Sequence, residues 1–386
     1  MFPTPDGQFP VEYQREDANY VFRQIIAGES CSLVGVGSVG KSNFMQFLTR
    51  ADVKSQYLST YAPYYVMVLL DPHQLIRPQQ QVLAMTGDAW PGYEIILNRL
   101  RRTLDFMIYD GQIANNQNEA TQMVQRVENR YHNLFHEQPL YTQTGIRQLE
   151  DAVYEIFSFQ PRLRVVFMFD EFEEFINLPA YFWQSLRGIR DEFKQRVMYV
   201  TASRFSLTEL VEQHIINRKD YLMIEGFVEL FHGFTRYLGV LDPQSAHASV
   251  ERLSRRYNAQ ISPELEHTLL YTTGFHNGLM RRGFRVAMRA ARRTGTTNPE
   301  FIDLLLQDQG TRDECVSIYE SLVEAEQTML KNVVCNREID VTSPAWSTLE
   351  NKHLVTRMEQ PPGSLLPVLT IPVFAMYIQR HVVGGC

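Results

Sequence analysis

The 386-residue sequence lacks several features that mark membrane, fibrous or metal-dependent proteins. It has no apolar run close to the ~20 residues that a membrane-spanning helix needs. It has no internal repeat, no low-complexity tract and no histidine cluster with the spacing of metal ligands. Residues 1–6 have neither a basic start nor an apolar core, so we expect no secretory signal. The hydrophobic content of 44% is typical of folded globular domains, and the length predicts two or three of them.

Cysteine is also scarce, and acidic residues outnumber basic ones. The four cysteines are Cys31, Cys315, Cys335 and Cys386. Their scattered positions match neither a disulfide framework nor a metal site, so we expect reduced thiols and a cytoplasmic protein. The net charge of −7 provides no global attraction to nucleic acid, although a local basic patch remains compatible with it.

A complete phosphate-binding motif follows the first apolar run. Residues 35–42 read Gly-Val-Gly-Ser-Val-Gly-Lys-Ser, between a strand-like stretch at 32–34 and a helix-like stretch at 43–48. Glycines in this context let backbone N–H groups wrap the β-phosphate of a nucleotide at the start of a helix. Lys41 would reach the β- and γ-phosphate oxygens, and the Ser42 hydroxyl would hold Mg²⁺. The residues expected to contact the nucleotide here are Gly35, Gly37, Ser38, Val39, Gly40, Lys41, Ser42 and Asn43.

A second run, at residues 164–171, is apolar throughout its centre and ends in two carboxylates. This pattern is typical of a parallel strand that is covered on both faces. Because ligands of open α/β sheets bind at the carboxyl ends of the strands, we expect the carboxylates beside the phosphate loop. Asp170 would hold Mg²⁺ through water, and Glu171 would orient or deprotonate the attacking water. The alternative is a buried strand that ends in acidic residues by chance.

Hydrophobic periodicity divides the rest of the chain. Further strands are predicted at 64–71, 196–202, 221–224, 354–357 and 366–370. Helices are predicted at 12–27, 180–193, 207–216, 316–330, 344–351 and 373–381, across 90–159 with a polar break at 115–118, and throughout 227–308. The turn Pro361-Pro362-Gly363 would close a hairpin.

These elements predict an α/β fold with three domains. Residues 1–226 would form a P-loop NTPase core, with a parallel sheet and a helical insertion at about 75–160. Residues 227–310 would form a helical lid. Residues 311–386 follow the order helix, helix, hairpin, which is that of a winged helix.

The chain resembles the STAND branch of P-loop ATPases, relatives of the origin-recognition AAA+ proteins. Besides the phosphate loop and acidic pair, three segments resemble family motifs. Residues 15–18, Arg-Glu-Asp-Ala, resemble an N-terminal box near the base. Residues 200–204, Val-Thr-Ala-Ser-Arg, resemble a strand that ends in a phosphate-sensing arginine. Residues 273–279 resemble the lid motif Thr-Gly-Gly-His-Pro, but Phe275 and Asn277 replace its second glycine and its proline.

The resemblance extends from about residue 11 to residue 382. It implies ATP and Mg²⁺ as cofactors, with Arg15 and His276 near the nucleotide. It also implies a switch that ATP closes and that hydrolysis or exchange opens. Family members carry sensor and effector domains, for which this chain has no room after the hairpin. We therefore expect a separate protein partner, an effector or a sensor, in signalling or defence, and allow for a homo-oligomer.

Two arginines are candidates for contacts with the terminal phosphate. Arg204, at a strand tip next to the acidic strand, would bind ATP far more strongly than ADP and so favour one conformation. Arg218, expected at the end of the next helix, would act as an arginine finger toward a neighbouring subunit. The alternatives are a surface arginine and a helix C-terminal arginine favoured by the helix dipole, respectively.

An arginine stripe leaves the choice of partner open. Arg281, Arg285, Arg289 and Arg292/Arg293 recur at helical spacing, with Arg282 beside them. They would form a lid sensor for phosphate, a surface for nucleic acid or an acidic partner, or a solvated face paired with acids such as Glu264 and Glu266. Residues 311–386 carry more acids than bases, which favours a protein over DNA. A DNA-loading or DNA-remodelling AAA+ ATPase is the alternative function, and a nucleotide-binding scaffold with negligible turnover is a third.

Overall fold

The computed structural model describes residues 8–76, 87–113, 117–135, 141–214, 217–290, 298–360 and 364–384. The chain forms two compact units. The core unit comprises Glu16–Leu33 and Ser42–Arg236. The C-terminal unit comprises Tyr237–Cys386 together with Met1–Arg15 and Val34–Lys41. The phosphate-binding motif therefore belongs, except for Ser42, to the C-terminal unit.

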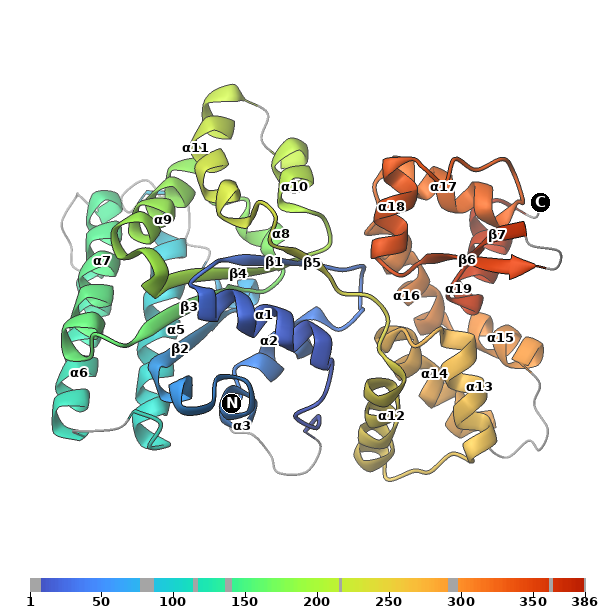
Figure 1. The fold of residues 1–386 in the computed structure, drawn as a ribbon, viewed down its shortest axis with the longest axis horizontal. Helices are drawn as coiled ribbons and strands as arrows, with labels where there is room; N and C mark the ends of the chain where they lie inside the picture. The colour runs from blue at the N-terminus through green and yellow to red at the C-terminus, as the bar shows by residue number, and fades with distance from the viewer. Residues whose placement is uncertain are drawn as a thin grey trace. The chain divides into compact units, whose positions relative to one another are not determined.

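A five-stranded sheet has the order β2-β3-β4-β1-β5 (Figure 1). Its strands are β1 (Cys31–Val34), β2 (Tyr65–Leu70), β3 (Arg164–Phe169), β4 (Val197–Ser203) and β5 (Thr235–Tyr237). The pairs β2/β3 and β3/β4 are parallel. These strands are buried almost throughout because helices cover both faces, which is why their sequences are apolar without alternation. The predicted α/β fold with a parallel sheet core is confirmed.

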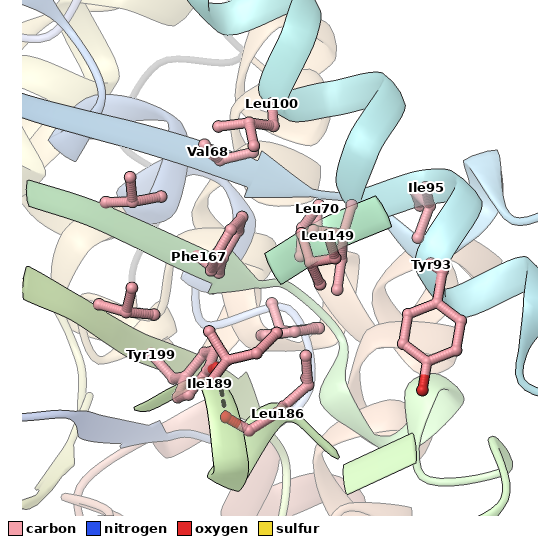
Figure 2. Packing of buried hydrophobic residues seen from close by; sticks show 14 of the residues in the cluster. Val68, Leu70, Tyr93, Ile95, Leu100, Leu149, Phe167, Leu186, Ile189 and Tyr199 are labelled. Carbon is pink, nitrogen blue, oxygen red and sulfur yellow. Dashed lines mark hydrogen bonds between the residues drawn. The ribbon is translucent and has the colours of Figure 1, made fainter. Parts of the chain in front are cut away.

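One face of the sheet packs against long helices, among them α5 (Trp90–Tyr109), α7 (Tyr141–Phe159) and α9 (Ala180–Phe193). Val68, Phe167 and Tyr199 are register partners across three strands, and all three point to this face (Figure 2). The Tyr199 hydroxyl donates to the carbonyl oxygen of Leu186 at 2.7 Å, so its buried polar group is satisfied. Each fully buried side chain of this size stabilises the fold by about 1.5–3 kcal/mol relative to an exposed one.

The other helices of the core unit are α1 (Arg15–Ala27), α2 (Lys41–Leu48), α3 (Ala51–Leu58), α6 (Gln117–Asn133), α8 (Phe172–Phe175), α10 (Leu207–His214) and α11 (Arg218–Val228). The prediction of helices across 90–159 is confirmed by α5, α6 and α7. Residues 115 and 116 of the predicted polar break lie outside the described residues, and α6 already begins at Gln117.

The strand predicted at 221–224 is wrong. These residues lie within α11, whose N-cap Asn217 accepts a hydrogen bond from the Asp220 N–H. Four consecutive apolar or aromatic residues do not distinguish a strand from a buried helix. The last strand of the sheet is β5, so the prediction of helices alone across 227–308 is also wrong. Arg218 consequently opens a helix instead of ending one, and the predicted stabilisation by a helix C-terminus does not apply.

The C-terminal unit is mainly helical. It contains α12 (Pro243–Tyr257), α13 (Pro263–Thr273), α14 (Asn277–Ala290), α15 (Asn298–Gln307), α16 (Gln309–Glu320), α17 (Glu324–Val334), α18 (Pro344–Asn351) and α19 (Pro372–Tyr377). An antiparallel hairpin joins β6 (Val355–Gln360) to β7 (Ser364–Leu369), and its predicted turn lies outside the described residues. A π-helical turn, Ile378–Val382, follows α19.

The single helix predicted at 316–330 is wrong, since α16 and α17 are separate. Residues 321–323 are not helical: Ser321 is the C-cap of α16, and Val323 is the N-cap of α17. Two other predicted helices differ only at their ends. The helix predicted at 12–27 begins at Arg15, and the one predicted at 373–381 is α19 with the π-helical turn.

The cysteine prediction holds in part. Cys31 and Cys315 are buried free thiols, and burial raises the pKa of Cys31 to about 12. Cys335 is disulfide-bonded, so the expectation of a reduced thiol is wrong at this position. Cys386 lies outside the described residues. Among the described helices none is long and apolar enough to cross a membrane.

A buried ion pair holds α17 to the end of α18. The Lys352 ammonium contacts both carboxylate oxygens of Glu326, at 2.8 and 2.9 Å, and the two side chains are 0% and 1% exposed. Glu326 also accepts a hydrogen bond from the Val323 N–H. The pair is therefore fully enclosed, and removing one charge takes away the ion pair that offsets the burial of the other.

We expect Lys352→Met to lower the free energy of unfolding by about 3–5 kcal/mol, because the Glu326 carboxylate stays buried and loses the ammonium that compensates its charge. The double variant Lys352→Met/Glu326→Gln should recover most of the loss, since the amide oxygen still accepts from the Val323 N–H. Urea unfolding followed by circular dichroism measures both. A double variant as unstable as the single one would contradict this account.

Candidate phosphate-binding site

The phosphate loop connects β1 to α2 through a strained backbone. Gly40 has a φ of +119°, which side-chain-bearing residues rarely adopt, and Ser38 has a φ of +56°. Lys41 is the first residue of α2, with Ser42 and Asn43 half-buried in its first turn. The loop therefore winds toward a helix N-terminus, as the motif predicts. Sequence spacing alone gave this local arrangement correctly.

Lys41 folds back over its own loop. Its ammonium donates to the carbonyl oxygens of Gly35 at 2.6 Å and Val36 at 3.1 Å, and the residue is 8% exposed. Val39 is buried within the loop, whereas Arg15 is exposed at the start of α1. The buried ammonium is the strongest local attraction for an anion that the loop itself supplies.

His276 contacts the loop from the C-terminal unit. Its Nε2 donates to the Gly37 carbonyl oxygen at 3.1 Å, and its Nδ1 accepts from the Leu279 N–H at 3.3 Å. Burial lowers the pKa of His276 to about 4, so the ring is neutral with its proton on Nε2. The neighbouring Gly278 N–H donates to the Ser38 carbonyl oxygen at 3.0 Å. The motif predicted for the lid thus holds the backbone of the phosphate loop.

Helix α16 also packs on the loop, which the sequence did not reveal. The Gly37 N–H donates to the Ser321 hydroxyl at 3.1 Å. A Cβ at Gly37 would lie 2.2 Å from the Ser317 hydroxyl oxygen and 2.5 Å from the Ser317 carbonyl oxygen. The absence of a side chain at Gly37 therefore permits close contact with α16. The sequence signals this contact only through polar residues at helical spacing, Glu314, Ser317 and Ser321. That spacing does not indicate which segment they contact.

The described arginines of the stripe have partners inside the C-terminal unit. Arg281 and Arg282 contact Glu314 Oε1 at 3.0 and 3.3 Å. Arg285 donates to the Tyr257 hydroxyl at 2.9 Å, and Arg289 pairs with Asp308 at 2.8 Å.

The acids that pair with the stripe are therefore Glu314 and Asp308. The sequence predicts acids such as Glu264 and Glu266 in this role, but Glu266 contacts His247. The rest of the predicted stripe, Arg292 and Arg293, lies outside the described residues.

The acidic pair follows β3 in the core unit. Asp170 is 8% exposed, and its Oδ1 accepts from the Glu171 N–H at 3.0 Å. Glu171 has a φ of +45° and precedes α8. Its carboxylate, 37% exposed, lies 3.6 Å from Nε2 of His73, which follows β2. The left-handed backbone thus turns two consecutive carboxylates in different directions, one buried and one accessible.

Arg204 and Arg218 occupy different environments. Arg204 follows β4, the strand between β1 and β3, and its Nε lies 3.3 Å from Glu173 Oε1. Its side chain is 43% exposed. In the strand order, β4 lies between β1, which leads into the phosphate loop, and β3, which leads into Asp170. The end of β4 that carries Arg204 therefore lies between the ends of those two strands. Arg218 is exposed in the first turn of α11.

Within the described ranges, no group of three or more histidine, cysteine or acidic side chains is arranged to hold a metal ion by itself. The Ser42 hydroxyl and the Asp170 carboxylate are nevertheless hard oxygen donors of the kind that Mg²⁺ prefers. Mg²⁺ typically takes one or two protein oxygens and completes its shell with phosphate and water. The residues present fit that pattern.

Comparison with known proteins finds distant structural likeness only. No protein-family model matches the chain, and no curated protein matches it. The Walker-type ATPase PABY2304 of Pyrococcus abyssi is 12% identical, with a TM-score of 0.49, over 98% of this chain and 99% of that one. Cdc6p from Pyrobaculum aerophilum is 10% identical, with a TM-score of 0.41, over 98% and 97%. Orc1 from Aeropyrum pernix, solved in complex with DNA, is 11% identical, with a TM-score of 0.39, over 96% and 93%. Likenesses at these identities and scores assign neither a family nor an activity.

We expect Gly37→Ala to cost about 1–3 kcal/mol of stability, because its methyl group overlaps the backbone of α16. The matched control is Gly188→Ala in α9, where a Cβ meets nothing within 4 Å. That change should stabilise the helix by about 0.5–1 kcal/mol. Denaturant unfolding of both variants tests the contact. Equal effects would show that α16 does not pack on the loop in solution.

Proposed function

We propose that this protein binds Mg·ATP at its phosphate loop and hydrolyses it, as an AAA+-like P-loop ATPase. The observation that carries the proposal is the position of a full Gly-x-x-x-x-Gly-Lys-Ser motif between β1 and α2. Asp170 and Glu171 support it, because they follow another strand of the same sheet. The carboxyl ends of parallel strands are where such sheets bind ligands.

The loop residues have distinct roles in this proposal. Backbone N–H groups between Gly35 and Asn43 surround the phosphates, except that of Gly37, which donates to the Ser321 hydroxyl. The Lys41 ammonium releases the carbonyl oxygens of Gly35 and Val36 and binds phosphate oxygens instead. Ser42 and Asp170 would hold Mg²⁺, which neutralises phosphate charge when bound. Arg15 is the candidate for the base side of the nucleotide. His276 shapes the loop through Gly37 instead of donating a proton, since its single N–H is already committed.

Glu171 is the proposed general base. It is accessible, whereas Asp170 is buried, and its pairing with His73 gives it a resting position from which it turns to the attacking water. Arg204 is the proposed sensor of the γ-phosphate. For that role it exchanges Glu173 for a phosphate oxygen, so the two states differ by an ion-pair partner. Arg218, exposed at the start of α11, is the candidate finger toward a second subunit.

The protein is proposed to act as a switch of the STAND type through a separate protein. Helices α17 and α18 and the β6–β7 hairpin follow one another in the order of a winged helix, which supports that assignment. The hairpin exposes apolar side chains, Met358 at 56% and Leu366 at 39%. Apolar groups of this size on a hairpin suit a protein surface better than a phosphate backbone.

DNA is the second candidate partner, as for a DNA-loading or DNA-remodelling ATPase. The observation that favours it is the arginine stripe on α14. The pairing of each described arginine in that stripe with a group of the same unit weakens it, because phosphate must compete for these side chains. ATPase assays with and without duplex DNA distinguish the two candidates.

We expect Lys41→Ala to abolish Mg·ATP binding, because the loop loses its buried charge. Glu171→Gln should bind Mg·ATP nearly as wild type while turnover falls by roughly 10²-fold or more, the scale of a lost general base. Calorimetry and phosphate release measure the two effects separately. Micromolar affinity in Lys41→Ala would refute the assignment of the loop. Unchanged turnover in Glu171→Gln would transfer the role to Glu173 or Glu174.

For Arg204→Ala we expect the loss of any ATP-dependent change in assembly or partner binding, with ADP affinity retained. The reason is that only ATP offers the γ-phosphate that replaces Glu173. Sedimentation with ATP or ADP measures the change. Arg147→Ala, which removes an exposed arginine from α7, is the matched control. If Arg204→Ala assembles like wild type, Arg218 across a subunit interface is the better sensor.

A further inference from the structure

Glu314 places a carboxylate against the phosphate loop. It is 5% exposed on α16 and is held through Oε1 by Arg281 and Arg282. Its other oxygen, Oε2, would lie 2.7 Å from a Cβ built on Gly278, and the same Cβ would lie 2.6 Å from the Cβ of Ser38. The carboxylate is therefore beside the loop backbone itself.

The carboxylate is charged but incompletely bound. Burial on its own would raise the pKa of Glu314, but the nearby Ser38 hydroxyl and the Arg281 and Arg282 guanidinium groups lower it below its usual value. Oε2 is buried, and apart from that Ser38 hydroxyl it meets no hydrogen-bond donor among the residues that the structure describes. A buried carboxylate oxygen with a single donor is costly, so this contact is less stable than a fully bonded pair.

Two kinds of group that recognise phosphate thus face an acid of the same chain. Guanidinium groups bind carboxylates and phosphates through the same donors, so one anion can replace the other. A phosphate arriving at the loop meets a like charge on the buried Glu314 side chain, where repulsion is poorly screened. Nucleotide binding and the Glu314 contacts therefore oppose each other.

From this arrangement we propose that Glu314 is a built-in competitor of the nucleotide phosphates and restrains binding at the loop. The proposal rests on the proposed function and adds a regulator to the same site. Ser317 and Ser321, on the same face of α16, hold the helix in place on Gly37, which keeps the carboxylate beside the loop. A partner that moved α16 would withdraw the carboxylate and release Arg281 and Arg282 together.

The test compares Glu314→Gln with wild type by calorimetric titration with Mg·ADP and Mg·ATP. Glutamine keeps the size of the side chain and removes its charge. We expect about tenfold tighter binding, within the usual range of intramolecular coupling. The gain should be larger for ATP, which carries more negative charge than ADP. Glu320→Gln, an exposed position at the end of the same helix, is the matched control and should leave both affinities unchanged.

The outcomes separate this inference from the proposed function. If wild type binds with an affinity that Lys41→Ala abolishes, and folded Glu314→Gln binds no tighter, the competitor proposal fails while the nucleotide site stands. An equal gain in Glu320→Gln would also overturn it, because the effect would then be one of net charge. If neither wild type nor Glu314→Gln binds Mg·ATP, both proposals fail. Thermal unfolding monitored by circular dichroism establishes that each variant is folded.

Discussion

The described structure depends on the backbone path of the phosphate loop. Gly40 takes a conformation that disfavours any side chain, and Gly37 permits no side chain because α16 lies against it. Lys41 can close over the loop because the carbonyl oxygens of Gly35 and Val36 point toward its ammonium group. The same path presents Gly37 and Ser38 to His276, Gly278 and Ser321. Local strain in the loop is thus balanced by contacts from sequence-distant helices, a common arrangement at functional sites.

The C-terminal unit surrounds the loop with polar groups of both signs. A neutral imidazole, a serine hydroxyl and a carboxylate each contact it or lie beside it, and two arginines neutralise the carboxylate. This distribution explains why the arginine stripe does not by itself indicate nucleic-acid binding. Among the described arginines of the stripe, Arg281, Arg282 and Arg289 already pair with acids of the same unit, and Arg285 donates to the Tyr257 hydroxyl. It also explains why α14 and α16 both matter at the loop although only α14 carries a motif that sequence inspection detects.

The sequence predicted the features that depend on local chemistry. The phosphate loop, the buried strand before Asp170, and the helix at 344–351 have the expected positions because each is encoded by neighbouring residues. The predictions are wrong where tertiary packing determines the secondary structure. The run at 221–224 is helical because one face of α11 is buried, and the helix expected at 316–330 breaks where Ser321 bonds to Gly37. The contact of Glu314 with the arginines joins residues 32 or 33 positions apart, for which no local pattern exists.

The assignment of Val34–Lys41 to the C-terminal unit has a consequence for cooperativity. This segment is covalently continuous with β1 and α2 of the core unit, yet it packs with residues after Tyr237. The chain therefore passes between the two units at four points, after Arg15, Leu33, Lys41 and Arg236. Neither unit is an uninterrupted stretch that could be excised at a single boundary. Local unfolding of α16 would break the hydrogen bond from the Gly37 N–H to the Ser321 hydroxyl. The phosphate loop would then lose part of its support when a helix almost three hundred residues further along the chain opens.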